Sequence, residues 1–140
     1  QAHYVSALKM FFEEPIFGIG PKMFRYYCDA AIFYVEKSCS THPHNTYIQL
    51  LAEIGIFAFF IVFSIFTYVL GIVIMQFIRI NFLHNKNLEP HVMLIISALL
   101  ISLWPIAPTG NFFNNFINVI YYFPVGILFY FLRQDNFFTK

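Results

Sequence analysis

Long intervals without a charged side chain occupy much of the chain after residue 53. No Asp, Glu, Lys or Arg lies between Glu53 and Arg79, and none lies between Glu89 and Arg133. Each interval is longer than the roughly 20 apolar residues that a helix needs to cross the core of a bilayer. Prolines and asparagines divide the second interval near residues 105–115. The pattern therefore predicts three transmembrane helices, over about residues 54–78, 91–106 and 116–132.

Residues 1–42 are polar by comparison and of mixed charge. Ala7 to Phe12 are typical of a short amphipathic helix, and the prolines and glycines that follow interrupt it. We expect a large loop outside the bilayer, with residues 43–140 forming the transmembrane region. The aromatic side chains expected to rest on the membrane surface are Phe11, Phe12, Phe17, Phe24, Tyr26 and Tyr27.

The first transmembrane helix is expected to begin well before the apolar interval. Thr41 is a good N-cap, and Pro43 is tolerated in a first helical turn, where its missing N–H costs nothing. From there the helix would continue without a break through His44 and Glu53 into the apolar segment.

Composition supports a membrane protein and argues against two other classes. Apolar residues make up 59% of the chain and charged residues 11%, against about 25% charged residues in a soluble domain. The 20 Phe and 9 Tyr are incompatible with a disordered chain. A net charge of +1 argues against a nucleic-acid partner, which requires a basic face. Because residue 1 is Gln and no secretory signal pattern follows, we expect the C-terminal part of a longer protein, inactive alone.

The positive-inside rule gives the expected orientation. Basic residues lie in the loop after the first predicted span and near the C-terminus, whereas the turn at 107–115 carries no charge. The turn and residues 1–53 are therefore expected outside the cytoplasm. The predicted fold class is an all-α membrane protein, in which about three transmembrane helices follow a large periplasmic loop with short helices. The basic residues that set this orientation are Arg79, Lys86, Arg133 and Lys140.

Cys28 and Cys39 are the two cysteines, and both lie in the predicted outer loop. An oxidising compartment would permit a disulfide between them. Closing this short loop would stabilise the fold by roughly 3 kcal/mol in the chain-entropy account. Two free thiols are the alternative, because connectivity does not follow from sequence.

His44 is the candidate general base. If Thr41 caps the helix, His44 lies in the first turn, where the positive end of the helix dipole disfavours a second positive charge. A neutral imidazole is what a general base requires, and free N–H groups of the same turn bind anions such as phosphate. The alternative is a histidine that merely lies at the membrane interface.

Three further charged residues are candidates for the site or its support. Lys22 and Arg25 would bind a phosphate group, or else be solvated loop charges paired with Asp29 or Glu36. Glu53 is nine residues after His44 and so lies on the opposite helix face, which makes it a poor orienting partner. We expect Glu53 to pair with a basic residue instead.

Two other motifs carry weaker hypotheses. Cys39, His42 and His44 would form a three-ligand zinc set, although their spacing matches no standard zinc finger. Gly18-Ile19-Gly20 is not a dinucleotide loop, because no third glycine follows and no βαβ pattern surrounds it.

The segment from His44 to Gly55, HNTYIQLLAEIG, resembles the signature of the O-antigen ligase and O-antigen polymerase superfamily. That signature is His, then Asn, Ser or Gln, then nine residues, Gly, two residues, and Gly, Thr or Tyr. The chain supplies His44, Asn45 and Gly55, and departs at the last place with Ala58. Residues 14–25 and 108–113 also resemble flanking segments of these proteins.

The resemblance implies a multi-pass glycosyltransferase of the bacterial inner membrane, with its catalytic loop in the periplasm. Members take a glycan from undecaprenyl pyrophosphate and, as ligases, attach it to lipid A core. The polymerases extend another carrier-linked glycan, and other relatives glycosylate proteins. No metal or cofactor is implied. The implied roles are His44 as base, Arg25, Lys22 and Asn45 as substrate-binding residues, and Gly55 and Glu53 as structural residues.

Two other functional hypotheses compete with a glycosyltransferase. One is a non-enzymatic membrane transporter or scaffold with the same fold, which would need a polar path through the spans. The predicted spans offer little for such a path beyond hydroxyl groups. The other is a zinc-dependent membrane hydrolase that uses Cys39, His42 and His44.

Overall fold

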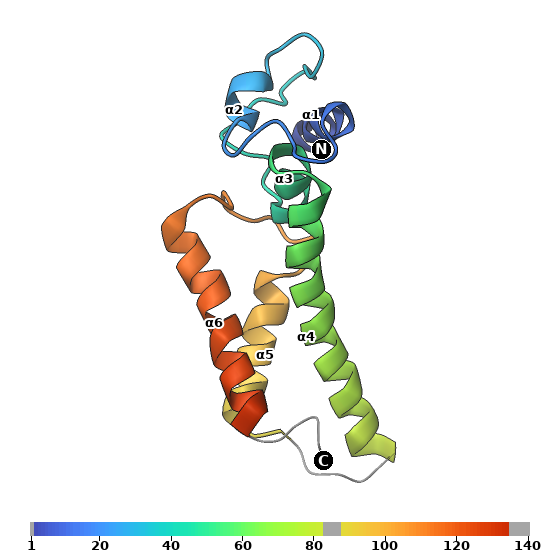
Figure 1. Cartoon of the computed structure of the whole chain (residues 1–140), viewed down its shortest axis with the longest axis vertical. Helices are drawn as coiled ribbons and strands as arrows, with labels where there is room; N and C mark the ends of the chain where they lie inside the picture. The colour runs from blue at the N-terminus through green and yellow to red at the C-terminus, as the bar shows by residue number, and fades with distance from the viewer. Residues whose placement is uncertain (1, 83–87, 135–140) are drawn as a thin grey trace. The chain divides into compact units, whose positions relative to one another are not determined.

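The computed structural model describes residues 2–82 and 88–134, and over these residues the chain is helical, without strands. The predicted all-α fold class is therefore confirmed. Lys86 and Lys140, two of the residues that set the predicted orientation, lie outside the described residues, so the orientation stays a prediction. The helices, shown in Figure 1, are α1 (Ala2–Glu13), α2 (Phe24–Tyr27), α3 (Thr46–Glu53), α4 (Ile56–Phe82), α5 (Pro90–Ser102) and α6 (Asn115–Gln134).

The chain folds as two compact units. The first comprises Gln1–Ser64 and Pro105–Ile117, and the second comprises Ile65–Trp104 and Asn118–Lys140. The first unit therefore holds α1, α2, α3 and the start of α4, together with the turn that precedes α6. All residues of the candidate site described below belong to this first unit.

Two helices are long and apolar enough to cross a membrane. They are α4, with 27 residues, and α6, with 20. At 1.5 Å per residue they measure about 40 Å and about 30 Å, and both are long enough to cross a bilayer core of about 30 Å. Helix α5 has 13 residues, or about 20 Å, and is shorter than a bilayer core. The count of three transmembrane spans thus stays a prediction. Two of the three helices, α4 and α6, are long enough to cross a bilayer core.

Most large side chains of α4 face outward, as lipid contact requires. Phe57, Phe60 and Ile61 are each more than half exposed, and so are Ile74 and Phe77 further along. A helix that is apolar all round and exposed in this way would be unfavourable in water.

The predicted continuous helix from Thr41 into the membrane is wrong at its start and in its middle. Helix α3 begins at Thr46, because Asn45 is the N-cap and its side chain accepts a hydrogen bond from the Ile48 N–H at 3.1 Å. Helix α3 ends at Glu53, and α4 begins at Ile56. The break lies at Gly55, whose φ of +86° belongs to the left-handed region that glycine enters without cost.

The loop of residues 15–20 packs against this break, backbone to backbone. The N–H groups of Ile19 and Gly20 donate to the carbonyls of Ala52 and Glu53, each at 3.0 Å. These carbonyls belong to the last turn of α3, which has no partners inside the helix. In return, the carbonyl of Pro15 accepts from the Ile56 N–H at 2.9 Å. The loop thereby caps the end of one helix and the start of the next.

Glycine is required on both sides of this contact. A Cβ at Gly18 would lie 2.5 Å from the backbone of Glu53 and Ile54, and a Cβ at Gly55 would overlap the carbonyl of Ile16. The small residues thus allow a backbone approach that any side chain would prevent. This gives a physical reason for Gly55, the glycine that ends the signature segment.

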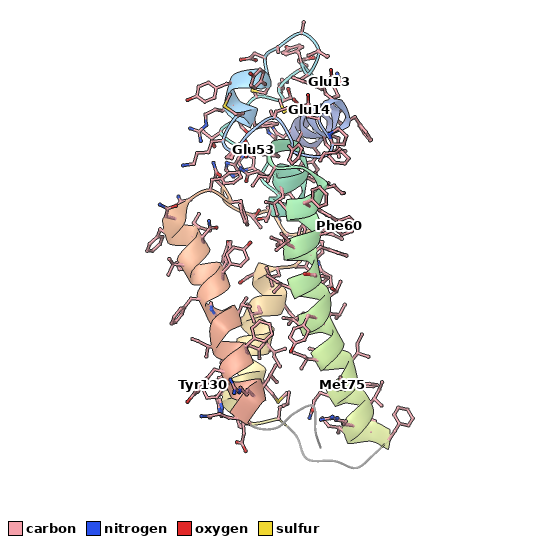
Figure 2. All side chains as sticks on the ribbon, in the orientation of Figure 1. Glu13, Glu14, Glu53, Phe60, Met75 and Tyr130 are labelled. Carbon is pink, nitrogen blue, oxygen red and sulfur yellow. A yellow bond between two sulfur atoms is a disulfide. The ribbon has the colours of Figure 1, made fainter. Side chains whose placement is uncertain are left out.

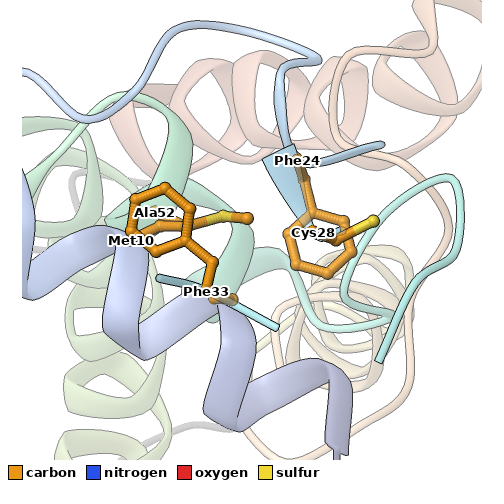
Figure 3. Close-up of a cluster of buried hydrophobic side chains, with 6 residues drawn as sticks. Met10, Phe24, Cys28, Phe33 and Ala52 are labelled. Carbon is orange, nitrogen blue, oxygen red and sulfur yellow. The ribbon is translucent and has the colours of Figure 1, made fainter. Parts of the chain in front are cut away.

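A small hydrophobic core holds α1 and α2 against α3. Its members are fully or nearly fully buried and come from three helices and the loop after α2 (Figure 3). The prediction that Phe24 rests on the membrane surface is wrong, because this side chain is fully buried in the core. Phe12, Phe17, Tyr26 and Tyr27 are exposed, as lipid contact requires. The core residues are Ala7, Met10, Phe24, Cys28, Phe33 and Ala52.

Candidate active site

His44 lies one residue before the N-cap of α3 and has an exposed side chain. Its φ is +61°, a left-handed conformation that is uncommon for a residue with a Cβ. A tertiary hydrogen bond supports it, since the His44 carbonyl accepts from the Thr109 N–H at 3.0 Å. The predicted position in the first helical turn is therefore wrong, and the helix-dipole argument that rested on it does not apply. Strain of this kind is concentrated at functional sites.

Two more histidines surround His44. The ring of His42 lies 4.2 Å from the His44 ring, and the ring of His3 lies 5.5 Å from it, measured between centroids. His3 is held by its Nδ1–H, which donates to the Ser38 carbonyl at 2.6 Å. Within the part of the chain that the structure describes, the ring nitrogens of His44 make no hydrogen bond. His44 is thus the histidine of this cluster that is free to meet a substrate.

His42 is held in one tautomer. Its Nε2–H donates to the Thr109 carbonyl at 3.3 Å, and its Nδ1 accepts from the Thr41 hydroxyl at 2.9 Å. Burial lowers the pKa of His42, and the positive charges of His44 and Arg25 lower it further, against a smaller upward effect of the Thr109 carbonyl. His42 is therefore neutral at pH 7 and adds no positive charge beside His44.

An open pocket of about 380 Å³ carries the two predicted cations. Lys22 and Arg25 line one side, and neither forms an ion pair with a described residue. The predicted alternative pairing of these cations with Asp29 or Glu36 is not found in the structure. Arg25 is also close enough to His42 for its charge to act on that ring. The lining residues are Lys22, Arg25, Asn111, Phe113, Asn114 and Asn115.

The pocket suits a ligand that combines an anion with hydroxyl groups. Ammonium and guanidinium groups bind phosphate oxygens, and the guanidinium does so with two donors at once. The three asparagine side chains supply amide NH₂ groups that can donate to sugar hydroxyls. Among the residues that the structure describes, no carboxylate lines the pocket to repel an anion.

Asn45 has a structural role in this fold. It is buried, its Oδ1 accepts from the Ile48 N–H, and its Nδ2 donates to the Pro105 carbonyl at 2.7 Å. Because both ends of the amide are occupied, the prediction that Asn45 binds substrate is not supported. It joins the start of α3 to the turn at 105–109, where the Thr46 hydroxyl also donates to the Thr109 hydroxyl at 2.9 Å.

Glu53 is fully buried at the end of α3 (Figure 2). Its Oε1 accepts from the Phe24 N–H and its Oε2 from the Gln49 amide, each at 2.8 Å. Burial raises the pKa of Glu53, while the hydrogen bonds and the charge of Arg25 oppose the rise. The expected basic partner is not found: among the described residues its direct partners are N–H groups.

Three residues of this region were not singled out from the sequence. His3 and Asn111 are far from the signature segment in sequence, and nothing in their local pattern marks them. Gln49 lies four residues from both Asn45 and Glu53, so the three share one helix face. This spacing can be seen in the sequence, but the hydrogen-bond partners of Gln49 in the turn at 111–112 cannot.

Comparison with known proteins finds a family match over the N-terminal part of the chain. The sequence profile of the family described as O-antigen ligase matches residues 2–63. The match covers less than half of the chain, and over this segment the chain is similar to the O-antigen ligase family. A search of curated proteins and a search of solved structures each found no match.

The matched O-antigen ligase segment contains α1, α2, α3 and the first turns of α4. It includes His44, Lys22 and Arg25. The asparagines of the opposite pocket wall lie outside it, at residues 111–115. The first compact unit therefore joins the matched segment to a distant turn.

Cys28 and Cys39 form a disulfide, with their Cα atoms 5.2 Å apart. Among the described residues, the metal-ligand types brought close together are Cys28, Asp29 and Cys39, rather than Cys39 with His42 and His44. The predicted zinc set is thus not assembled. Cys39 offers no thiolate to a metal while it is bonded to Cys28.

Loss of the disulfide is expected to destabilise the first unit. Replacing both Cys28 and Cys39 by serine opens a crosslink with a sequence separation of 11, and the chain-entropy account gives a loss of about 3 kcal/mol. The check is the thermal unfolding midpoint of the complete protein in detergent, with and without reductant. Reductant should lower the wild-type midpoint to that of the double variant and leave the double variant unchanged. Equal midpoints for all samples would contradict the prediction.

Proposed function

We propose that the protein transfers a glycan from an undecaprenyl pyrophosphate carrier to an acceptor hydroxyl, such as one on lipid A core. The reaction takes place at the periplasmic face of the bacterial inner membrane. His44 is the general base, and Lys22 and Arg25 bind the pyrophosphate. The family match supports a glycosyltransferase of this type in general. No metal or cofactor has a role in this proposal.

The observation that carries the proposal is the neighbourhood of His44. Its exposed ring is 4.2 Å from His42, and His42 lies within electrostatic range of Arg25, which lines the cationic pocket. Glycosyl transfer from a pyrophosphate needs a base for the incoming hydroxyl and positive charge for the leaving group. The arrangement offers both within one compact unit.

The chemistry balances with these groups alone. The acceptor hydroxyl gives its proton to a ring nitrogen of His44, and its oxygen forms a bond to the anomeric carbon of the glycan. The bond from that carbon to the pyrophosphate oxygen breaks. The released carrier pyrophosphate takes up the negative charge, which Lys22 and Arg25 stabilise.

The test is to express the complete protein in a bacterial strain that makes the lipid-linked glycan but lacks its own ligase. A glycan ladder on lipid A core supports the ligase reaction. Longer glycans that remain on the carrier would instead assign an O-antigen polymerase, and glycosylated proteins would assign a protein O-oligosaccharyltransferase. If a well-expressed protein yields none of these three products, the proposal is overturned in favour of a transporter or scaffold.

The pocket cations give a second, separate prediction. Replacing Lys22 by asparagine, which tolerates its left-handed backbone at φ +62°, and Arg25 by alanine should weaken binding of the carrier pyrophosphate by at least about tenfold. Hydrogen bonds to charged groups contribute about 1.5–3 kcal/mol each. The check is the amount of undecaprenyl pyrophosphate bound by the complete protein in lipid nanodiscs.

The matched control is Lys9→Gln, which removes an exposed cation on α1 that donates to the Tyr34 carbonyl. It should leave binding unchanged. Unchanged binding in the pocket variant as well would show that the pyrophosphate lies elsewhere.

A further inference from the structure

A buried chain of hydrogen bonds joins the two walls of the cationic pocket. One wall carries Lys22 and Arg25, and the other is the turn at residues 111–115. The two walls are far apart in sequence. Gln49 and Glu53, one helical turn apart on α3, lie between them and contact both.

Gln49 is fully buried, and both ends of its amide are occupied. Its Oε1 accepts from the Phe112 N–H at 2.9 Å. Its Nε2 donates to the Asn111 Oδ1 at 3.0 Å and to the Glu53 Oε2 at 2.8 Å. One side chain thus ties the asparagine turn to the buried carboxyl group.

Glu53 completes the connection to the cationic wall. Its Oε1 accepts from the Phe24 N–H at 2.8 Å, and the backbone N–H of Lys22 is close enough to lower the pKa of this carboxyl group. The contacts are made to the backbone, so the positions of Lys22 and Phe24 are set independently of their side chains. Phe24 in turn directly precedes Arg25.

Backbone N–H donors determine how the side-chain amides in this series of hydrogen bonds are oriented. The Phe112 N–H requires the oxygen of the Gln49 amide, which turns the Gln49 nitrogen toward Glu53 and Asn111. The Phe113 N–H donates to the Asn111 Oδ1 at 2.9 Å, and the Gln49 nitrogen donates to the same oxygen. The Asn111 oxygen is therefore fully used, and its NH₂ group is the part left to donate to a ligand.

We propose that Gln49 is a positioning residue for the lipid-linked pyrophosphate donor. Through Asn111 it turns an amide NH₂ toward the pocket, and through Glu53 it holds the asparagine turn at a fixed distance from Lys22 and Arg25. The donor oxygens would then meet two cations on one wall and an oriented N–H donor on the other. This inference rests on the proposed function, because it names the donor that the pocket would hold.

The test begins with Gln49→Met, which keeps the length of the side chain and removes its hydrogen bonds. In nanodiscs, the dissociation constant for undecaprenyl pyrophosphate should rise about tenfold, the equivalent of one good hydrogen bond. In the transfer assay, the KM for the donor should rise while kcat stays close to wild type. A folded Gln49→Met protein with wild-type affinity would overturn the proposal.

Asn111→Ala provides the second variant, and it keeps the test valid if Gln49→Met does not fold. It should weaken donor binding to a similar extent. In the double variant, the two effects should not add, since Gln49 acts through Asn111. Additive effects, or an unchanged affinity in Asn111→Ala, would overturn the proposal.

The matched control is Gln76→Met, which alters another buried glutamine, in α4. It should leave donor affinity at the wild-type value. Failure of the proposed function is recognised separately, as a wild-type protein that binds the carrier but produces none of the glycosylated products. In that case the binding measurements still decide the role of Gln49.

Discussion

Replacing His44 by asparagine is expected to abolish the glycan ladder on lipid A core while the protein is still inserted in the membrane. General bases contribute roughly 10²–10⁴-fold to a reaction rate, so the variant should fall below detection on a gel. Asparagine is the right replacement because it tolerates the left-handed backbone of His44, at φ +61°. Alanine in this conformation would cost about 1–2 kcal/mol and would mix a folding defect with a chemical one.

The control is His44→Gly, which removes the ring and relaxes the backbone at the same time. It should lose the ladder as completely as His44→Asn, although it suits the backbone better. A ladder of wild-type intensity in either variant, at equal expression, would remove His44 from the mechanism.

Replacing Gly55 by alanine is expected to be the most damaging single change to the fold. The φ of +86° disfavours a Cβ, and the added Cβ would overlap the carbonyl of Ile16. A left-handed alanine costs about 1–2 kcal/mol, and overpacking adds about 1–3 kcal/mol. The variant should therefore lose about 2–5 kcal/mol of stability, because the loop that caps α3 can no longer approach.

Gly71→Ala is the matched control, since a Cβ at this position in α4 would meet nothing within 4 Å. It should leave the thermal unfolding midpoint of the complete protein in detergent unchanged or slightly raised. Gly55→Ala should lower the midpoint, and Gly18→Ala should lower it similarly because its Cβ would meet the backbone of Glu53. Equal midpoints for Gly55→Ala and Gly71→Ala would show that the close approach is not required.

The local pattern was enough to predict the helical class and the position of the longest apolar helix. Charge-free apolar runs of about 20 residues are long enough to cross a bilayer as helices, so α4 and α6 were predicted from the positions of these runs. The break between α3 and α4 at Gly55 could not be predicted from the local sequence pattern. A glycine within an apolar helical pattern is usually tolerated, and only the loop at 15–20, distant in sequence, makes this one a chain break.

The site was predicted in its charged and histidine residues but not in its geometry. His44, Lys22 and Arg25 stand out as polar groups near a membrane boundary. The choice of Asn45 over Thr41 as N-cap depends on tertiary bonds to Pro105 and Thr109, since both residue types cap helices well.

The asparagine wall of the pocket could not be predicted from the sequence either, because it also depends on tertiary contacts. The sequence separation between Gln49 and Asn111 is 62, and no local rule pairs them. In the sequence alone, nothing distinguishes Gln49 from an ordinary helix residue. Its importance appears only when the asparagine turn is placed beside α3.

The measurement that tests the central claim most directly is the transfer rate of the purified complete protein and of its His44→Asn variant, in nanodiscs with saturating lipid-linked glycan and lipid A core. A general base predicts that kcat falls by roughly 10²–10⁴-fold, while the dissociation constant for undecaprenyl pyrophosphate stays at the wild-type value. A His44→Asn protein that transfers glycan at the wild-type rate would contradict the assignment of His44 as the base.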